Sequence, residues 1–327
     1  MCLTCCLTTM TKPDGFDDRL AHSLELVRKA ERTALVYDPT DGFYLAFSGG
    51  KDSQALYHLA RMAGVRFKAH MNFTSVDPPQ VIRFVRDRYP DVVGHAPEKS
   101  IYAYALEMGM LPSISIRWCC ERLKETKSAG RVTLVGVRAA ESKARAKRAE
   151  IEVTSHRFSG SYDEFTEWQA MMWEKRDGIV RRKYQRLKMP INDDMFTIEH
   201  ESELRCVRGN DAIIVSPLFR WSDDDVWYFL NDVVQVPHCE LYDWGYKRIG
   251  CILCPMSGHA QKRREIADFP RVKRQWIDTI GKIRAKRTEL TGMWAELTDD
   301  EIFDWWISKQ DYDTWYASNK AQQKLDF

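Results

Sequence analysis

Long hydrophobic runs are missing from this sequence. No apolar stretch approaches the roughly 18 residues that a membrane-spanning helix needs, and residues 1–15 (MCLTCCLTTMTKPDG) have neither the basic start nor the apolar length of a secretory signal. These two absences predict a cytoplasmic protein with no membrane segment. Internal repeats and low-complexity tracts are absent as well, which excludes a repeat architecture.

A surplus of charge of one sign is also lacking. The 49 Lys and Arg residues nearly balance the 47 Asp and Glu residues, and the net charge is +2. Overall electrostatics therefore predict no polyanionic partner, and a nucleic-acid interaction would need local patches. The 327 residues, 44% of them hydrophobic, suffice for one large domain or two modest ones. Nine cysteines, an odd number in a chain expected in a reducing compartment, argue against a disulfide framework and favour metal or redox chemistry.

The spacing of apolar residues predicts alternating helices and strands. Helices are predicted over residues 17–39, 51–63 and 78–91. Strands are predicted over residues 43–47, 65–75 and 131–139. Such alternation is typical of an α/β fold with a doubly wound parallel sheet, in which ligands bind at the carboxyl ends of strands. Residues 157–205 are predicted to be an insertion of helix and loop, and the chain after residue 216 is predicted to be mostly helical apart from a loop around Cys251.

A glycine-rich turn separates the first predicted strand from the next helix, in FYLAFSGGKDSQALYHLA (43–60). Free backbone N–H groups and the positive end of the helix dipole suit a phosphate group. The turn is not a Walker A loop, because Leu45 and Asp52 stand where that pattern needs a glycine and a hydroxyl residue. It is not a dinucleotide GxGxxG either. A tight turn with incidental polar side chains is the alternative interpretation.

The hexapeptide SGGKDS (48–53) resembles the signature of the PP-loop ATP pyrophosphatases, the adenine nucleotide alpha hydrolases of HUP type. In that family the loop holds the phosphates of ATP, and the bond between the α- and β-phosphates is broken. The resemblance implies that Lys51 offsets the charge on the departing pyrophosphate, and that the other loop residues bind phosphate or its Mg²⁺. Those other residues are Ser48, Gly49, Gly50, Asp52 and Ser53. Fixed donors and a cation suit this chemistry, because negative charge builds up on the leaving group.

Two pairs of cysteines form what we call the cysteine group: Cys119, Cys120, Cys251 and Cys254. Four thiolates are the right number for a metal centre. Tetrahedral zinc usually draws on two CxxC knuckles, whereas adjacent cysteines suit the separated corners of a cubane. A [4Fe–4S] cluster is therefore expected, with zinc as the alternative. Burial as small side chains would explain the CC pair alone, and a redox dithiol the CxxC pair alone, but neither explains both pairs.

The pairing of CC with a distant CxxC resembles the cluster site of assimilatory adenylylsulfate reductases. The same pairing occurs in the reductase-like ATP pyrophosphatases of DNA phosphorothioation. The sequence assigns no role to the remaining cysteines: Cys2, Cys5, Cys6, Cys206 and Cys239.

Residues 134–148 (LVGVRAAESKARAKR) are predicted to leave a strand and enter a helix on which Arg138, Arg145 and Arg148 share one face. A solvated basic face is the alternative. The segment resembles the G-x-R-x-x-E-S-x-x-R stretch of the phosphoadenylylsulfate (PAPS) reductase family, which contacts the nucleotide or its phosphates. This resemblance implies that Arg138 and Arg145 act on phosphates.

The segment SPLFRWSDDDVWYFL (216–230) resembles the P-L-x-x-W-x-x-x-D-V-W helix of the same family, with Trp221 and Trp227 expected in the core. The whole resemblance covers roughly residues 40–260. It does not cover the N-terminal tail, the insertion 157–205 or the C-terminal helices. Resemblance and helical pattern together predict a tail with a helix, a PP-loop and PAPS reductase-like domain, and a C-terminal helical region: 1–38, 39–256 and 257–327.

Two departures from the sulfonucleotide reductases favour genuine ATP cleavage. Those reductases attack sulfur with a cysteine on a C-terminal tail, whereas no cysteine follows Cys254 in this sequence. Their phosphate loop is degenerate, whereas SGGKDS is intact.

Residues 174–188 (EKRDGIVRRKYQRLK) carry a run of basic side chains interrupted by one tyrosine. Basic residues with interleaved aromatics can follow a phosphate backbone and stack on bases. Arg181, Arg182 and Lys183 are therefore candidates for a nucleic-acid path, with a solvated helix face as the simpler interpretation. Residues 301–316, acidic and aromatic, suit a core-packing or partner-binding helix.

The sequence thus predicts an ATP pyrophosphatase that adenylates an oxygen of its acceptor, after which sulfur delivered through the iron–sulfur site displaces AMP. The expected acceptor is a nucleic acid, with DNA favoured as in phosphorothioation and tRNA second, and the expected sulfur donor is a protein such as a cysteine desulfurase. Two alternatives stay open. One is a sulfonucleotide reductase that uses a thiol such as Cys206 or Cys239, and the other is a nucleotide-sensing iron–sulfur module that binds DNA without catalysis.

Overall fold

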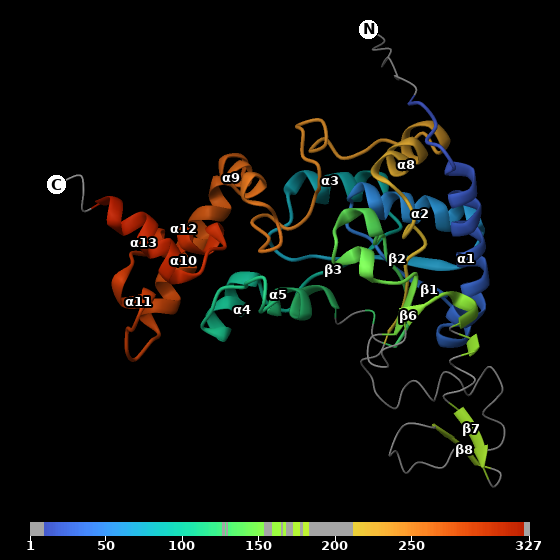
Figure 1. Ribbon diagram of the computed structural model, residues 1–327, viewed down its shortest axis with the longest axis horizontal. Coiled ribbons are helices and arrows are strands. Elements are labelled where there is room, and N and C mark those ends of the chain that lie inside the picture. Colours follow the sequence, from blue (N-terminus) through green and yellow to red (C-terminus); the bar gives the residue numbers. More distant parts are fainter. Residues whose placement is uncertain are drawn as a thin grey trace. The chain divides into compact units, whose positions relative to one another are not determined.

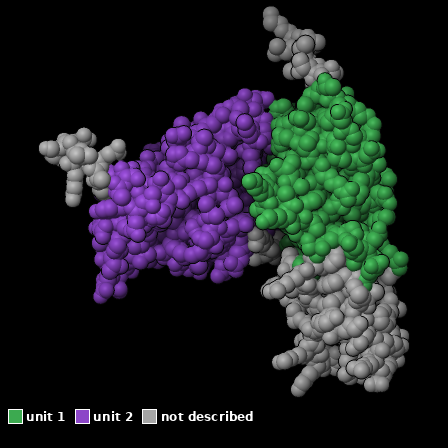
Figure 2. Space-filling model, in the orientation of Figure 1, with its two compact units in different colours: residues 1–71, 83–94, 126–240 green, residues 72–82, 95–125, 241–327 purple. Residues whose placement is uncertain are grey.

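The chain divides into two compact units in this computed structural model (Figure 2). The sheet unit contains residues 1–71, 83–94 and 126–240, and the helical unit contains residues 72–82, 95–125 and 241–327. Each unit combines three segments of the chain. The linear domain boundaries expected at residues 39 and 257 stay a prediction. The structure describes residues 10–125, 128, 130–153, 159–164, 166–167, 173–176, 179–182 and 212–323.

A seven-stranded sheet organises the sheet unit (Figure 1), with the strand order β3-β2-β1-β4-β9-β5-β6. β1 pairs in parallel with β2 and β4, and β4 pairs in parallel with β9, whereas β5 is antiparallel to β9 and β6. The strands are β1 Phe43–Ala46, β2 Phe67–Asn72, β3 Val93–His95, β4 Val132–Leu134, β5 Ile151–Val153, β6 Ser159–Gly160 and β9 Ile213–Val215. This mostly parallel sheet with crossover helices confirms the predicted α/β fold.

β1 lies where the strand order reverses. The chain leaves β1 for β2 on one side and later returns to its other side with β4. Phe43, Tyr44 and Leu45 of β1 are all buried, as expected for a parallel strand that is covered on both faces. Ligands of open parallel sheets bind beyond the carboxyl ends of the strands at such a reversal. The loops after β1 and β4 are therefore the part of this fold that is placed to hold a ligand.

The helices around the sheet follow the predicted pattern closely. They are α1 Phe16–Tyr37, α2 Lys51–Ala63, α3 Pro79–Arg88, which spans the division between the units, and α8 Asp223–Tyr228 with the π-helical turn η5 Phe229–Val233. α2 covers the predicted residues 51–63 and ends at Gly64, whose φ of 74° is the left-handed conformation usual after a helix. α1 packs against α2 and buries its apolar side there.

The helix predicted after β4 is wrong. Two short 3₁₀ turns take its place, η2 Ala139–Glu141 and η3 Arg145–Lys147. Arg138, Arg145 and Arg148 therefore share no helix face, and each pairs with a different carboxylate in the sheet unit.

The insertion contains strands as well as helix in the part that is described. β7 Trp173–Arg176 and β8 Ile179–Arg182 form an antiparallel hairpin. The interpretation of the basic run as a helix face is therefore wrong for these residues, which include Arg181 and Arg182. Lys183 and residues 184–211 lie outside the described residues.

The helical unit is built from short and medium helices. They are α4 Ile101–Met108, α5 Trp118–Cys120, the π-helical turn η1 Glu121–Glu125, α9 His259–Asp268, α10 Pro270–Ala285, α11 Met293–Glu296, α12 Asp299–Ser308 and α13 Tyr312–Gln323. Its core is aromatic, since the rings of Trp276 and Trp306 lie with their centroids 4.9 Å apart and Phe303 is fully buried. Residues 301–316 thus pack into a core, as one of the two sequence interpretations expected.

The two tryptophans of residues 216–230 differ in burial. Trp221 is buried, 1% exposed, as predicted, whereas Trp227 is only partly buried and stacks edge-on against His238. Among the described helices, none combines the length and the apolar character that crossing a bilayer would require.

Candidate functional site

The loop after β1 forms a tight turn at the start of α2. Gly49 has a φ of 72°, which glycine adopts without strain, and no side chain in the described part of the chain caps the N-terminus of α2. Ser53 closes the turn, because its hydroxyl donates to the carbonyl of Gly50 at 2.8 Å and accepts from the N–H of Ser48 at 3.1 Å. The predicted residues 48–53 therefore form one turn that presents a helix N-terminus, which suits an anion.

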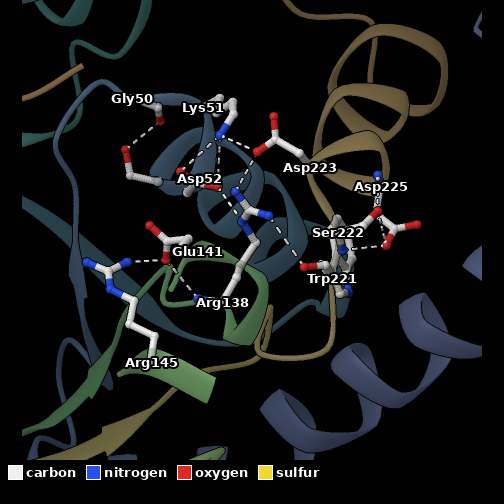
Figure 3. Close-up of polar contacts among 11 residues, drawn as sticks. Gly50, Lys51, Asp52, Arg138, Glu141, Arg145, Trp221, Ser222, Asp223 and Asp225 are labelled. Carbon is white, nitrogen blue, oxygen red and sulfur yellow. Dashed lines mark hydrogen bonds and ion pairs between the residues drawn. The ribbon is translucent and has the colours of Figure 1, made fainter. Parts of the chain in front are cut away.

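Four charged side chains, which we call the charged cluster, gather beside this turn (Figure 3): Lys51, Asp52, Arg138 and Asp223. Arg138 Nε donates to Asp52 Oδ1 at 2.7 Å, and Arg138 Nη2 donates to Asp223 Oδ1 at 2.7 Å. Lys51 Nζ lies 2.9 Å from that same Asp223 oxygen and 3.4 Å from Asp52 Oδ2. The cluster joins the start of α2, the loop after β4 and the start of α8.

Burial differs sharply within the charged cluster. The side chains of Lys51 and Arg138 are 5% and 3% exposed, whereas that of Asp223 is 60% exposed. Burial opposes ionisation of Asp223, but hydrogen bonds from Lys51 and Arg138 outweigh it and lower the pKa of Asp223. The cluster therefore carries two fixed, buried cations next to a helix N-terminus, an arrangement that can bind phosphate groups.

Gly136 permits the close packing of the loop after β4 against α2. A Cβ atom at this position would lie 2.9 Å from the backbone oxygen of Asp52 and 3.3 Å from its Cβ. Protein interiors are packed too tightly to absorb such contacts without a shift. The glycine in the predicted nucleotide motif therefore fixes the position of Asp52.

Gly136→Ala is expected to displace Asp52, with a loss of about 1–3 kcal/mol in the free energy of unfolding from the added contact. The ATP turnover that the motif SGGKDS predicts should fall by about tenfold. Gly258→Ala is the matched control, because no atom beyond its chain neighbours lies within 4 Å of a Cβ there in the described part of the structure. Turnover and denaturant unfolding are measured for both variants. Unchanged turnover in Gly136→Ala would show that this contact does not position Asp52.

Arg145 lies outside the charged cluster. Its guanidinium pairs with Glu141, whose carboxylate accepts the backbone N–H of Arg138 at 3.0 Å. Arg145 is thus linked to the cluster through Glu141 (Figure 3). Its direct action on a phosphate stays a prediction.

Asp223 is the member of the charged cluster that sequence reasoning missed. It is the first residue of α8, whose start is fixed by a capping box between Ser222 and Asp225. Asp225 is in turn anchored by an ion pair with Arg19 at 2.7 Å. The pattern Ser-x-x-Asp before an apolar run marks a helix start, so the sequence could have placed Asp223 and Asp224 at an exposed N-terminus. It could not have shown which of them faces Arg138.

The cysteine group lines one pocket within the helical unit. One pair of thiols comes from α5 and the other from the loop before α9, and the pocket between them is partly open to solvent. Leu253 holds that loop in place, because its N–H donates to the buried carboxylate of Glu265 at 2.7 Å. The structure therefore brings the four predicted cysteines to a single cavity.

Polar groups surround these thiols. Arg117 Nη2 donates to Cys120 Sγ at 3.2 Å, and the Cys251 thiol donates to Thr74 Oγ1 at 3.4 Å. The hydrogen bond from Cys119, helped by Arg117 and opposed by burial, lowers the pKa of Cys120, whereas burial raises the pKa of Cys251. The lowered pKa favours the thiolate form of Cys120, the form that binds metals.

Trp276 supplies an unused hydrogen-bond donor at the same pocket. Its indole lines the pocket and is 1% exposed, and Nε1 has no partner among the described residues. A buried donor without an acceptor is rare in folded proteins. No set of three or more His, Cys, Asp or Glu side chains in the described ranges is arranged to hold a single metal ion.

The other cysteines take no part in this pocket as far as the structure describes them. Cys239 is fully buried in the sheet unit. Cys2, Cys5, Cys6 and Cys206 lie outside the described residues.

Comparison with known proteins finds one family over most of the chain. The profile of the phosphoadenosine phosphosulfate reductase domain matches residues 42–257. An uncharacterised protein of Methanocaldococcus jannaschii is 26% identical over 262 residues, which cover 76% of this chain and 50% of that protein. An adenosine 5'-phosphosulfate reductase of Oceanobacillus iheyensis is 49% identical over 43 residues, 13% of this chain and 18% of the reductase.

The chain thus spans half the length, or less, of these curated relatives. Among solved structures, phosphoadenylyl-sulfate (PAPS) reductase from Candida auris in its phosphate complex is 17% identical, with 74% of this chain and 97% of that chain covered at a TM-score of 0.38.

Proposed function

Because this chain belongs to the phosphoadenosine phosphosulfate reductase domain family, we propose that it binds a nucleotide at residues 48–53 and that it cleaves ATP between the α- and β-phosphates. The charged cluster is the observation that carries this proposal. It places two buried cations at the carboxyl ends of β1 and β4, beside the N-terminus of α2. That is where ligands of such sheets bind and where phosphate groups find donors.

The cluster suits the departure of pyrophosphate. Cleavage at this bond leaves negative charge on the leaving group, and Lys51 and Arg138 can stabilise it without reorganising, since both are buried and fixed. Their burial also strengthens the electrostatic interaction. Mg²⁺ prefers oxygen ligands and keeps several waters, so the carboxylate of Asp52 would hold it together with the phosphates. When bound, Mg²⁺ neutralises phosphate charge.

We further propose that the cysteine group holds a [4Fe–4S] cluster. Four thiols line one cavity, and such a cluster is held by four thiolates. The donors Arg117 and Trp276 suit anionic sulfur. When bound, the cluster would supply a site for sulfur delivery, and Arg117, which donates to Cys120 Sγ, would help to orient that ligand.

The proposed acceptor is a nucleic acid, DNA first and tRNA second, with sulfur from a donor such as a cysteine desulfurase. This part of the proposal rests on the resemblance to the DNA phosphorothioation enzymes and on the basic residues 174–188. Of these, the structure describes 174–176 and 179–182.

A sulfonucleotide reductase is the second candidate function. The family itself and the short match to an adenosine 5'-phosphosulfate reductase favour it. The intact phosphate loop with its buried Lys51 favours ATP cleavage instead, because that loop offers a cation to a leaving pyrophosphate.

The two functions differ in their products. We would incubate the anaerobic protein and Mg²⁺ with ATP, with adenylylsulfate or with PAPS, each with a thiol reductant, and measure pyrophosphate and sulfite. We expect pyrophosphate from ATP and no sulfite from the other two nucleotides. Sulfite without pyrophosphate would assign the reductase function. Duplex DNA and tRNA are then added separately, and the one that increases pyrophosphate release identifies the acceptor.

A further inference from the structure

One carboxylate oxygen is shared between the two buried cations of the charged cluster. Asp223 Oδ1 lies 2.9 Å from Lys51 Nζ and accepts a hydrogen bond from Arg138 Nη2 at 2.7 Å. The two cations reach it from different elements, the start of α2 and the loop after β4 (Figure 3). A phosphate oxygen makes contacts of this kind and length with lysine and arginine. The position of Oδ1 is therefore one that an anionic phosphate oxygen can occupy.

Arg138 is buried and makes several hydrogen bonds, whereas Asp223 is exposed. Arg138 is also bound to Asp52 at 2.7 Å and to the Trp221 carbonyl at 3.4 Å, and its side chain is 3% exposed. Moving either cation away would leave a buried charge unpaired, which is costly. The Asp223 side chain is 60% exposed, so a rotation of this side chain returns its carboxylate to water. The contact therefore breaks most easily on the aspartate side.

We infer that Asp223 occupies a phosphate-oxygen position between Lys51 and Arg138 in the ligand-free protein, and that a phosphate group of the nucleotide displaces it. Asp223 is then a positioning residue that keeps both cations paired and oriented until phosphate binds. It also competes with the ligand, because the apparent affinity for phosphate falls as the Asp223 carboxylate occupies the position for more of the time. An anion enters the position when it binds Lys51 and Arg138 more tightly than the carboxylate does.

This inference rests on the proposed nucleotide site but not on which bond is cleaved. Inorganic pyrophosphate without divalent metal is therefore the probe, and its binding is measured separately from the products formed from ATP. Asp223→Asn removes the competing charge but keeps an oxygen that can accept from Lys51 and Arg138. Asp223→Ser is the second variant, in case the amide perturbs folding.

Calorimetric titration of the full chain should show pyrophosphate binding on the order of tenfold tighter in Asp223→Asn than in the wild type. Asp224→Asn makes the same charge change at the exposed neighbouring residue and should bind like the wild type. Lys51→Met added to Asp223→Asn should abolish the gain. The rise in melting temperature on adding pyrophosphate provides a second measure for each folded variant.

Equal or weaker binding in both Asp223 variants would overturn the inference, and so would an absence of pyrophosphate binding in all the proteins. A gain of the same size in Asp224→Asn would also overturn it, because general charge would then explain the effect. Tighter pyrophosphate binding in Asp223→Asn, together with no cleavage of ATP by the wild type, would support the inference and contradict only the proposed function.

Discussion

Arg138→Met is expected to lower ATP turnover by about 100-fold or more, whereas Arg145→Met should lower it only a few-fold. The sequence motif gives both arginines the same predicted role, but the structure separates them. Arg138 is 3% exposed and binds Asp52 and Asp223 inside the charged cluster, whereas Arg145 is 29% exposed and pairs with Glu141. The measurements are kcat and KM for ATP with both variants.

Two controls separate loss of chemistry from loss of fold. Arg148→Met removes a basic residue that pairs with Glu152 outside the cluster and should keep wild-type turnover. Arg138→Lys keeps the charge but loses the planar fork that holds two carboxylates, so it should recover part of the turnover. Unfolding curves show whether each variant is folded. Equal losses in Arg138→Met and Arg145→Met would contradict the assignment of the cluster as the phosphate site.

Serine in place of any one member of the cysteine group is expected to remove most of the iron from the anaerobically prepared protein. The wild type should carry about four irons and four sulfides per chain, because four cysteines ligate one cubane. Cys239→Ser is the matched control, since Cys239 is buried in the sheet unit and does not line the pocket. Iron and sulfide analysis with the visible absorption spectrum measures the effect.

Zinc bound at one ion per chain, with no iron under anaerobic conditions, would show that the metal was wrongly inferred. Full iron content in each of the four serine variants would show that the cysteine group does not bind the cluster at all.

The elements with strong local signals were predictable from the sequence. α1, β1 and α2 were expected within two residues of their observed ends, because apolar spacing and the glycines at 49, 50 and 64 act over a few neighbouring positions. The turn of residues 48–53 and the common pocket of the cysteine group were expected as well. Phosphate binding requires glycines and donors next to one another, and metal binding requires paired cysteines. Both patterns occur within a few consecutive residues of the sequence.

The segment after β4 was not predictable in the same way. Its alanines favour a helix, but the N–H of Ala139 donates to the carbonyl of Phe219 at 2.9 Å, and Glu141 accepts from the N–H of Arg138. The first of these bonds joins residues far apart in the chain and outweighs local propensity. The pairing of Arg138 with Asp223 is also a contact between residues far apart in the chain. Sequence reasoning therefore had no basis for choosing Asp223 over Asp224 as the partner of Arg138.

Phosphorus NMR of ATP during a single turnover with the anaerobic protein and Mg²⁺ tests the central claim most directly, because it identifies the broken bond. The charged cluster predicts that the signals of ATP give way to those of AMP and pyrophosphate, and that Lys51→Met prevents this change. Signals of ADP and orthophosphate would contradict the account, as would unchanged ATP in a protein that releases sulfite from adenylylsulfate.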